Sequence, residues 1–182
     1  MKKIRVLVFL AFLTALEIVL NRFCSFNTLG VKIGFSFVPV IIAAILFGPL
    51  GAAAVNGVGD LLGAILFPIG PYHPGFTLCA ALMGMVSGLF LYRKSSAGKM
   101  RRFFANILPS VLINNLVFGL CINTLWISML YSRKTYFGFF VSRLLTEYPA
   151  LILMQLVMIP VLYRLEKPLS KIFNNQNVNY KR

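Results

Sequence analysis

Residues 32–92 constrain the fold of this chain more than any other stretch, because they form three apolar runs separated by two short turns. The runs cover residues 35–47, 50–67 and 76–92, with turns at 48–49 and 68–75. Runs this apolar belong in a bilayer, where helices close their own backbone hydrogen bonds. One acid, Asp60, interrupts the middle run, and a carboxylate there costs roughly 2.5 to 3.5 kcal/mol on insertion scales. We therefore expect three membrane helices in which Asp60 faces a cavity, a partner or a ligand.

The composition extends this prediction to the whole chain. Of its 182 residues, 59% are hydrophobic and 12% are charged, against about 25% charged in soluble domains. We predict an all-α integral membrane protein with one domain, 1–182, built as a six-helix transmembrane bundle. The helices are expected at about 4–20, 35–47, 50–67, 76–92, 104–130 and 136–163, followed by a cytoplasmic tail at 164–182. The first run is predicted to be a helix and not a cleaved signal peptide, because Glu17, Asn21 and Arg22 argue against cleavage and no small-x-small site follows at the expected distance.

The basic residues cluster by membrane side. The net charge of +14 would suggest a nucleic-acid partner in a soluble protein. Here an even number of helices places both termini on one side, together with most of the 18 basic residues. The positive-inside rule makes that side the cytoplasm. We therefore expect a multi-pass protein of the cell membrane, in contact with lipid and without a nucleic-acid partner.

A minority of basic residues lies at or near the opposite face, and it suggests a site for an anion. These residues are Arg22, Lys32, Arg133, Lys134 and Arg143. Long basic side chains also extend to the interface without binding anything, so both interpretations stay open. Arg143 and Glu147 are one helical turn apart and could simply pair with each other.

Metal and nucleotide chemistry are not expected in this chain. His73 is the single histidine, and Cys24, Cys79 and Cys121 lack metal-ligand spacing, so we predict neither a metal nor a cofactor. A phosphate-cradling glycine-rich loop ending in Lys-Ser/Thr is missing from the sequence, so any ATP must be hydrolysed by separate subunits. A small intramembrane enzyme remains an alternative of another class, and it would have to work with Asp60, Glu17 and Glu147.

The first helix and the outer loops supply further candidate residues. Ala11 and Ala15 share one face of the first helix, where small side chains allow another helix to approach closely; packing within the bundle is the alternative. The loop at 68–75 is stiffened by prolines, so Tyr72 and His73 could stack on a flat ligand or anchor the interface. Trp126 lies near the outer end of the fifth run.

These residues resemble a known family. The segments that carry the resemblance are Lys32-Ile33-Gly34-Phe35, Pro39, Phe47-Gly48-Pro49-Leu50-Gly51, Gly59-Asp60-Leu61-Leu62-Gly63-Ala64, Phe67-Pro68, Gly70 and Pro74-Gly75-Phe76-Thr77. They resemble the substrate-binding S components of energy-coupling-factor (ECF) vitamin transporters, and most closely the folate-specific branch. Asn123-Thr124-Leu125-Trp126 and Arg143 also resemble that branch. Asn56 and His73 depart from it and could alter ligand preference.

The resemblance implies a six-helix bundle whose outward pocket is roofed by the loops after helices one, three and five. It also implies that Ala11 and Ala15 dock on a transmembrane coupling subunit and, through it, on two ATPase subunits. The expected function is high-affinity folate binding for uptake. Alternatives are an S component for another vitamin or flat heterocycle, and a stand-alone facilitator.

Each end of folate then has expected partners. Its dianionic glutamate tail requires cations, and Arg22 and Arg143 are preferred to Lys32 because a guanidinium binds carboxylates in a bidentate manner. Its pterin ring presents an amine beside a ring N–H, which Asp60 could accept with two parallel hydrogen bonds; Glu147 is the second choice. Trp126 and Tyr72 could sandwich the ring.

Overall fold

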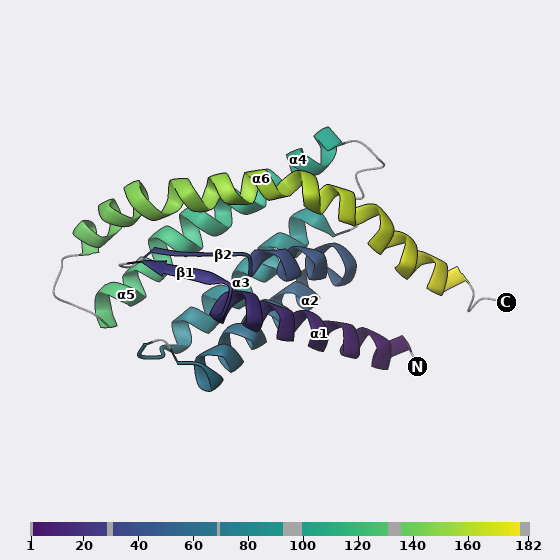
Figure 1. Ribbon diagram of the computed structural model, residues 1–182, viewed down its shortest axis with the longest axis horizontal. Helices are drawn as coiled ribbons and strands as arrows, with labels where there is room; N and C mark the ends of the chain where they lie inside the picture. The colour runs from purple at the N-terminus through teal and green to yellow at the C-terminus, as the bar shows by residue number, and fades with distance from the viewer. Residues whose placement is uncertain (1, 29–30, 69, 93–99, 131–135, 179–182) are drawn as a thin grey trace.

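The computed structural model describes residues 2–28, 31–68, 70–92, 100–130 and 136–178, and it is an elongated helical bundle with one small hairpin (Figure 1). The elements are α1 (Lys2–Arg22), β1 (Ser25–Thr28), β2 (Val31–Gly34), α2 (Phe37–Leu66), α3 (Pro74–Leu91), α4 (Met100–Ile113), the π-helix η1 (Asn114–Asn123), α5 (Thr124–Leu130) and α6 (Tyr136–Val178). The start of α1 and the end of α6 lie at the same end of the long axis, here called the terminal end (Figure 1). The hairpin lies toward the opposite end, here called the hairpin end.

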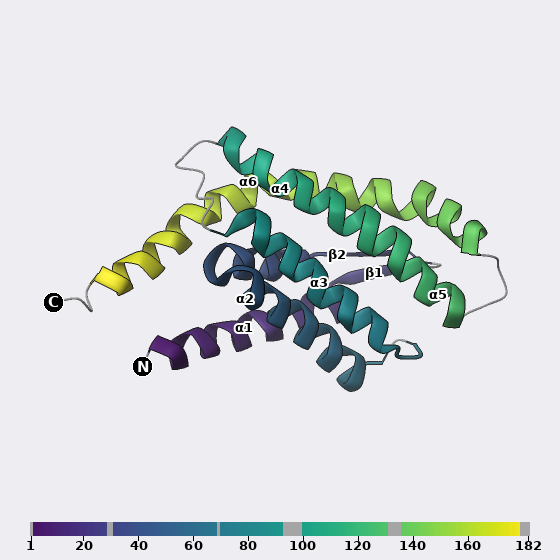
Figure 2. The same ribbon diagram turned by 180° about the vertical axis from the view of Figure 1, so that it is seen from behind.

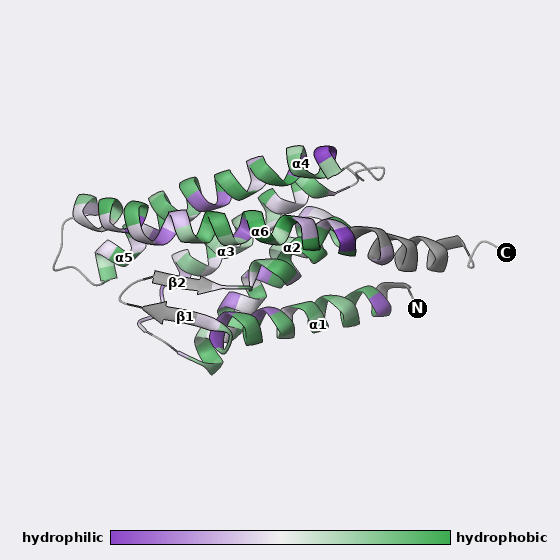
Figure 3. Ribbon diagram, turned by 45° about the horizontal axis from the view of Figure 1, so that its top comes forward, coloured by the Kyte–Doolittle hydropathy of each residue, from purple (hydrophilic) through white to green (hydrophobic). Residues whose placement is uncertain are grey.

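The described residues contain five helices that are long and apolar enough to cross a membrane. They are Ile4–Arg22, Phe37–Leu66, Pro74–Leu91, Met100–Leu130 and Tyr136–Leu165. Hydrophobic residues run along the outside of these helices (Figure 3), and Leu7, Leu145 and Val157 are each about 70% exposed, at 69%, 71% and 71%. A soluble monomer rarely leaves so much apolar surface uncovered. This surface indicates contact with lipid.

The count is five instead of the predicted six because residues 35–47 and 50–67 belong to one element, α2. The helix is interrupted at Gly48, whose φ of 77° and ψ of −161° are not helical, and Pro49 follows. Figure 2 shows α2 folding back on itself, so that the segments on either side of Gly48 run in opposite directions. Only glycine adopts a positive φ at little cost, and here the ring of Tyr92 also covers the space that a Cβ would need.

Glycines bring α2 and α3 into backbone contact. A Cβ at Gly84 would overlap the carbonyl group of Ala52, and one at Gly88 would overlap the backbone of Pro49. In lipid, helices gain stability from such close packing because the hydrophobic effect does not drive them together. The second half of α2 and α3 therefore form an antiparallel pair, and α1 packs against the same half of α2 at Gly59 and Gly63.

The segment between α1 and α2 differs from the predicted loop, because it forms a two-stranded antiparallel hairpin. Ser25 pairs with Gly34, and Asn27 pairs with Lys32. The β-branched Val31 and Ile33 suit an extended backbone, but the strands are too short to be recognised by alternation alone. In the described part of the chain, this hairpin is the only β-structure.

The helix predicted at 104–130 is continuous from α4 to α5, but it winds as a π-helix at Asn114–Asn123. The side-chain amide of Asn115 donates to the carbonyl oxygen of Val111 at 2.8 Å. That carbonyl would otherwise accept the backbone N–H of Asn115, so the side chain competes with the regular ladder. Segments of π-helix occur frequently at functional sites.

Helix α6 continues beyond its predicted end at residue 163, since it ends at Val178. Most of the predicted tail, 164–182, is therefore helical as far as Val178. Proline occurs inside the helix at 149, 160 and 168, and Figure 1 shows the C-terminal part of α6 bending away from the bundle. A proline inside a helix removes a hydrogen bond and kinks the helix without necessarily ending it. This accounts for the bend of α6 and for its continuation beyond the bend.

Candidate ligand-binding site

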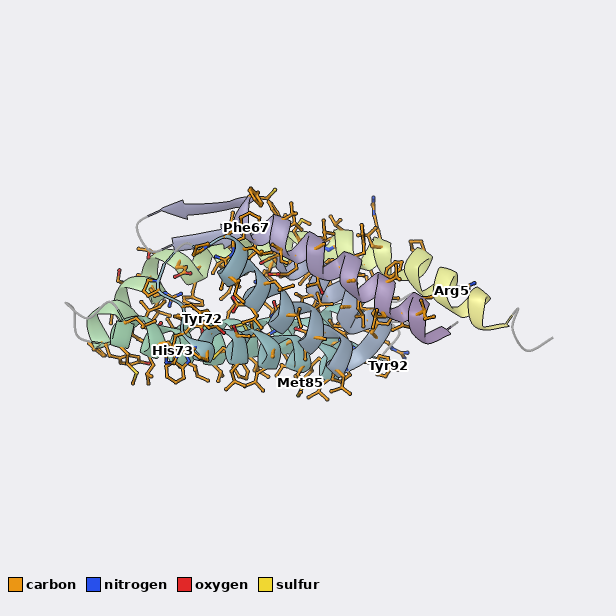
Figure 4. The ribbon with its side chains drawn as sticks, turned by 90° about the horizontal axis from the view of Figure 1, so that it is seen from below. Arg5, Phe67, Tyr72, His73, Met85 and Tyr92 are labelled. Atoms are coloured by element: carbon orange, nitrogen blue, oxygen red, sulfur yellow. The ribbon has the colours of Figure 1, made fainter. Side chains whose placement is uncertain are left out.

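Several predicted ligand residues gather toward the hairpin end. Figure 4 shows Tyr72 and His73 toward one end of the bundle, with Arg5 and Tyr92 toward the other. The side chain of Lys32 and both Arg133 and Lys134 lie outside the described residues. The remaining candidates fall into separate polar groups, each held by a different pair of helices.

Asp60 on α2 is connected to the loop before α3 through a chain of hydroxyl groups. The hydroxyl of Thr77 donates to Oδ2 of Asp60 at 2.8 Å, and the hydroxyl of Tyr72 lies 3.0 Å from that of Thr77. Because a threonine hydroxyl has a single proton, Tyr72 must be the donor in the second bond. Asp60 is only partly buried, and its other carboxylate oxygen remains available to a ligand.

His73 connects the start of α3 to α5. It is the N-cap of α3, where its Nδ1 accepts the backbone N–H of Gly75 at 3.0 Å, and Pro74 follows at the first helical position. The same imidazole stacks on the indole of Trp126, with centroids 4.6 Å apart and planes 29° apart. Gly75 packs against the same indole. The stack seen here is thus His73 on Trp126, and Tyr72 contacts Thr77 instead of Trp126.

The cap and the stack can be separated by mutation. His73→Asn keeps a capping side chain and loses the ring, whereas His73→Phe keeps a ring and loses the cap. We expect His73→Phe to lower the free energy of unfolding by about 1 kcal/mol. Trp126 is the only tryptophan, so its fluorescence reports on the stack. Emission should shift to longer wavelength in His73→Asn and stay in place in His73→Phe; equal emission from both variants would contradict the assignment.

Arg143 and Glu147 form a buried ion pair on α6, which is the pairing that their spacing allowed. Nε of Arg143 lies 2.6 Å from Oε2 of Glu147, and Nη2 donates to Oε1 at 3.2 Å. Nη1 donates to the hydroxyl of Thr124, which is fully buried. Glu147 is 3% exposed. Both predicted ligand residues therefore already have partners, and a bound carboxylate would have to share the guanidinium with Glu147.

Arg22 lies at the end of α1 and packs over Gly63 of α2. Its Nε is buried, and in the described part of the chain it has no hydrogen-bond partner. The neighbouring Asn21 donates to the buried carboxylate of Glu17 at 2.8 Å. A buried N–H group without a partner is costly, so this guanidinium has a free donor that an anion could use.

A polar cavity of about 180 Å³ lies deeper, between α2, α3, α4, η1 and α6. Its polar lining consists of Ser36, Asn56, Ser87, Ser110, Asn114, Asn115 and Gln155. None of the eight predicted ligand residues whose side chains are described lines it. Two signals in the sequence pointed toward it: Asn56 shares a helical face with Asp60, and the fifth apolar run is rich in asparagine.

The described residues contain no group of three or more His, Cys, Asp or Glu side chains that could hold a metal ion. The polar groups that the site offers are amides, hydroxyls, two arginines and two carboxylates. Such groups recognise an organic molecule by hydrogen bonds and charge.

A bundle of apolar helices around a cavity lined by uncharged polar and apolar side chains defines a multi-pass membrane protein with room for a small molecule. Residues 5–167 match the family model for the ECF transporter, substrate-specific component. The chain belongs to this family, which confirms the resemblance seen in the sequence.

Individual relatives narrow the comparison. The chain is 40% identical over 147 residues to the folate transporter FolT of Clostridium novyi (strain NT), covering 81% of each protein. It is 27% identical over 127 residues to the folate transporter FolT of Leuconostoc mesenteroides, covering 70% of this chain and 65% of that protein. A crystal structure of FolT bound with folic acid matches with a TM-score of 0.66 and 28% identity over 86% of each chain.

Proposed function

We propose that this protein is the folate-binding S component of an ECF transporter, which captures folate outside the cell and delivers it by docking on an ATP-driven module. The observation that carries the proposal is the 40% identity to a folate transporter over 81% of both chains. The likeness to a folic acid complex supports it over nearly the same length. The uncharged cavity, and the guanidinium groups of Arg22 and Arg143 outside its lining, fit a ligand with a neutral ring and an anionic tail.

The proposal includes a topology of six membrane segments with both termini in the cytoplasm of a prokaryotic cell. The reversal at Gly48 divides α2 into two segments, which gives an even total. The two ends of the chain lie at the same end of the bundle (Figure 1). That end carries the basic residues that favour the cytoplasm.

The docking surface is proposed to be the outer face of α1. Ala11 and Ala15 are exposed there, beside large apolar residues such as Leu7 and Phe12, which are 69% and 62% exposed. The opposite face, with Leu13 and Glu17, is buried in the bundle. The small side chains are thus free to receive a helix of the coupling subunit, which in turn would bind two ATPase subunits.

Folate is proposed to bind with its glutamate tail near Arg22 and Arg143, assisted by Lys32, and with its pterin donors on Asp60. Tyr72, His73, Asn123 and Trp126 would surround the ring system. The buried Nε1 of Trp126 and Oδ1 of Asn123 have no hydrogen-bond partner among the described residues. A ligand with both donors and acceptors would satisfy them.

Asp60→Asn tests the pterin contact. The change keeps the shape of the side chain and an oxygen that can accept from the hydroxyl of Thr77. It replaces the other carboxylate oxygen by an NH₂ group, which would face the N–H donors of the pterin ring. We expect the affinities for folic acid and for 6-methylpterin to fall together by at least tenfold, with an unchanged unfolding temperature. Calorimetric titration of the purified protein measures the two affinities, and thermal unfolding measures the unfolding temperature.

Arg22→Gln should affect the two ligands differently, in contrast to Asp60→Asn. We expect the affinity for folic acid to fall at least tenfold and the affinity for 6-methylpterin, which lacks the glutamate tail, to stay unchanged. Equal losses for both ligands would remove the tail assignment. If Asp60→Asn binds normally and Glu147→Gln does not, the pterin acceptor lies on α6.

The function itself is tested by identifying the molecule that copurifies with the protein from cells, using mass spectrometry, followed by titration with folic acid. A folate should be found, and it should bind tightly without any partner subunit. An uncharged vitamin or another flat heterocycle in its place would refute the folate assignment and retain the family.

A further inference from the structure

Glu17 is a buried acid on α1 that neither of the ligand contacts proposed above uses. Its side chain is 1% exposed and lies on the face of α1 that packs against α2. A carboxylate within a membrane helix is costly, and such a residue usually serves a function. The contacts of Glu17 indicate what that function is.

A pair of glycines on α2 receives two polar side chains of α1. A Cβ at Gly59 would overlap the carboxylate of Glu17, and one at Gly63 would lie 2.9 Å from Nε of Arg22. The two contacts follow the same order along both helices, so α1 runs parallel to this half of α2. Along α1, Glu17 and Arg22 are separated by a rise of about 7.5 Å, and along α2 the two glycines are separated by about 6 Å. When Glu17 lies against Gly59, Arg22 therefore reaches Gly63.

Asn21 connects Glu17 to the last turn of α1 and to the hairpin. The side-chain amide of Asn21 donates to Oε1 of Glu17 at 2.8 Å. The backbone carbonyl of Asn21 accepts the hydroxyl of Ser25 at 2.7 Å, and Ser25 pairs with Gly34 in the hairpin. Arg22 lies between these contacts in the sequence. The carboxylate of Glu17 thus fixes the segment of backbone from which the guanidinium extends.

The same contacts order Arg22 while leaving it a free donor. Its side chain lies over Gly63, and its buried Nε has no hydrogen-bond partner in the part of the chain that the structure describes. A long side chain that is already ordered loses less conformational freedom when it binds an anion. Asp60 is held separately, because its Oδ2 accepts the hydroxyl of Thr77 on α3. The groups proposed for the tail and for the ring of folate are therefore oriented by different helices.

We infer that Glu17 is a positioning residue for the glutamate tail of folate: by fixing α1 against Gly59, it holds the guanidinium of Arg22 where the tail binds. This inference rests on the proposed function. Glu17 is assigned no contact with the ligand, since an ionised carboxylate would repel the tail. The sign of its effect is therefore informative. Removing a competing negative charge would strengthen folate binding, whereas removing a positioning contact weakens it.

The test compares Glu17→Ala with Glu17→Gln by calorimetric titration of the purified protein. Alanine empties the space over Gly59 and removes the acceptor of Asn21. We expect its affinity for folic acid to fall about tenfold, and its affinity for 6-methylpterin to stay within about twofold of the parent. Glutamine keeps the size of the side chain and an oxygen that accepts from Asn21, so its affinity for folic acid should stay within about twofold of the parent.

Thr14→Ala is the matched control on the same helix. The hydroxyl of Thr14 donates to the carbonyl oxygen of Leu10 at 2.9 Å, within α1. Removing it takes a polar group of α1 away without touching the contacts of Glu17. Neither affinity should change.

A double variant shows whether the effect of Glu17 passes through Arg22. Added to Arg22→Gln, Glu17→Ala should lower the affinity for folic acid by no more than about twofold further, because the guanidinium that it positions is gone. If Glu17→Ala does not fold, Asn21→Ala cuts the same connection and should weaken folic acid alone.

The outcomes distinguish the inference from the function. Three results overturn the inference and leave the folate function intact: equal losses for both ligands, a full further loss in the double variant, or tighter binding of folic acid in Glu17→Gln. Unchanged binding in Glu17→Ala, or in Asn21→Ala where only that variant folds, does the same. If the parent protein binds another anionic ligand in place of folate, and Glu17→Ala weakens it only while Arg22 is present, the positioning role stands and the folate function fails.

Discussion

Replacing Ala11 and Ala15 together by tryptophan is expected to abolish folate uptake by cells while leaving folate binding by the purified protein unchanged. Both alanines are exposed on α1, and the face that packs on α2 carries Leu13 and Glu17 instead. Two indole rings would hold a partner helix away from the backbone, where close packing provides the attraction between membrane helices. Uptake of labelled folate and titration in detergent measure the two quantities.

Val157→Trp is the matched control, because this residue is 71% exposed on α6 and far from α1 in the sequence. It adds an indole to a lipid-facing position and should leave both uptake and binding unchanged. Should the double tryptophan variant still transport folate, the docking surface lies elsewhere, or the protein works without a coupling subunit.

Breaking the pair of Arg143 and Glu147 is the change with the second largest expected effect. Glu147→Leu leaves the guanidinium, among the described residues, with the hydroxyl of Thr124 as its hydrogen-bond acceptor and the ring of Tyr148 beneath it, but without a counter-charge. Removing one member of a buried ion pair typically costs about 3 to 5 kcal/mol, so the free energy of unfolding should fall by that amount. Denaturant titration in detergent measures it.

The double variant Arg143→Met with Glu147→Leu separates charge from packing. Replacing both members of a buried pair by apolar residues is often nearly neutral, so most of the lost stability should return. Folic acid binding should stay weaker than in the parent protein, because the tail would still lack the Arg143 guanidinium. A double variant as unstable as Glu147→Leu would show that packing, not the unpaired charge, causes the loss.

Features set by local chemistry were predictable from the sequence. The interruption of α2 follows from Gly48-Pro49, since glycine allows a positive φ and proline resists continuation of the helix. The pair of Arg143 and Glu147 follows from a spacing of four residues on a helix. The lipid-exposed face of Ala11 and Ala15 follows from helical periodicity.

Features that depend on distant partners were not predictable. His73 and Trp126 stack only because the loop before α3 reaches α5. The cavity combines Asn56, Asn114 and Gln155 from three separate helices, and nothing in their spacing shows that they meet. The π-helix depends on where the side chain of Asn115 places its hydrogen bonds, a choice that apolar periodicity does not report.

The break at Gly48 has a consequence for biogenesis. Residues 37–47 rise only about 16 Å, roughly half of the 30 Å hydrocarbon core, and are too short to be inserted alone. We therefore expect them to enter the bilayer as one hairpin with residues 49–66. The first turn of this hairpin, at Ser36 and Phe37, is half-buried and lines the cavity, so insertion of the hairpin also places part of the cavity wall.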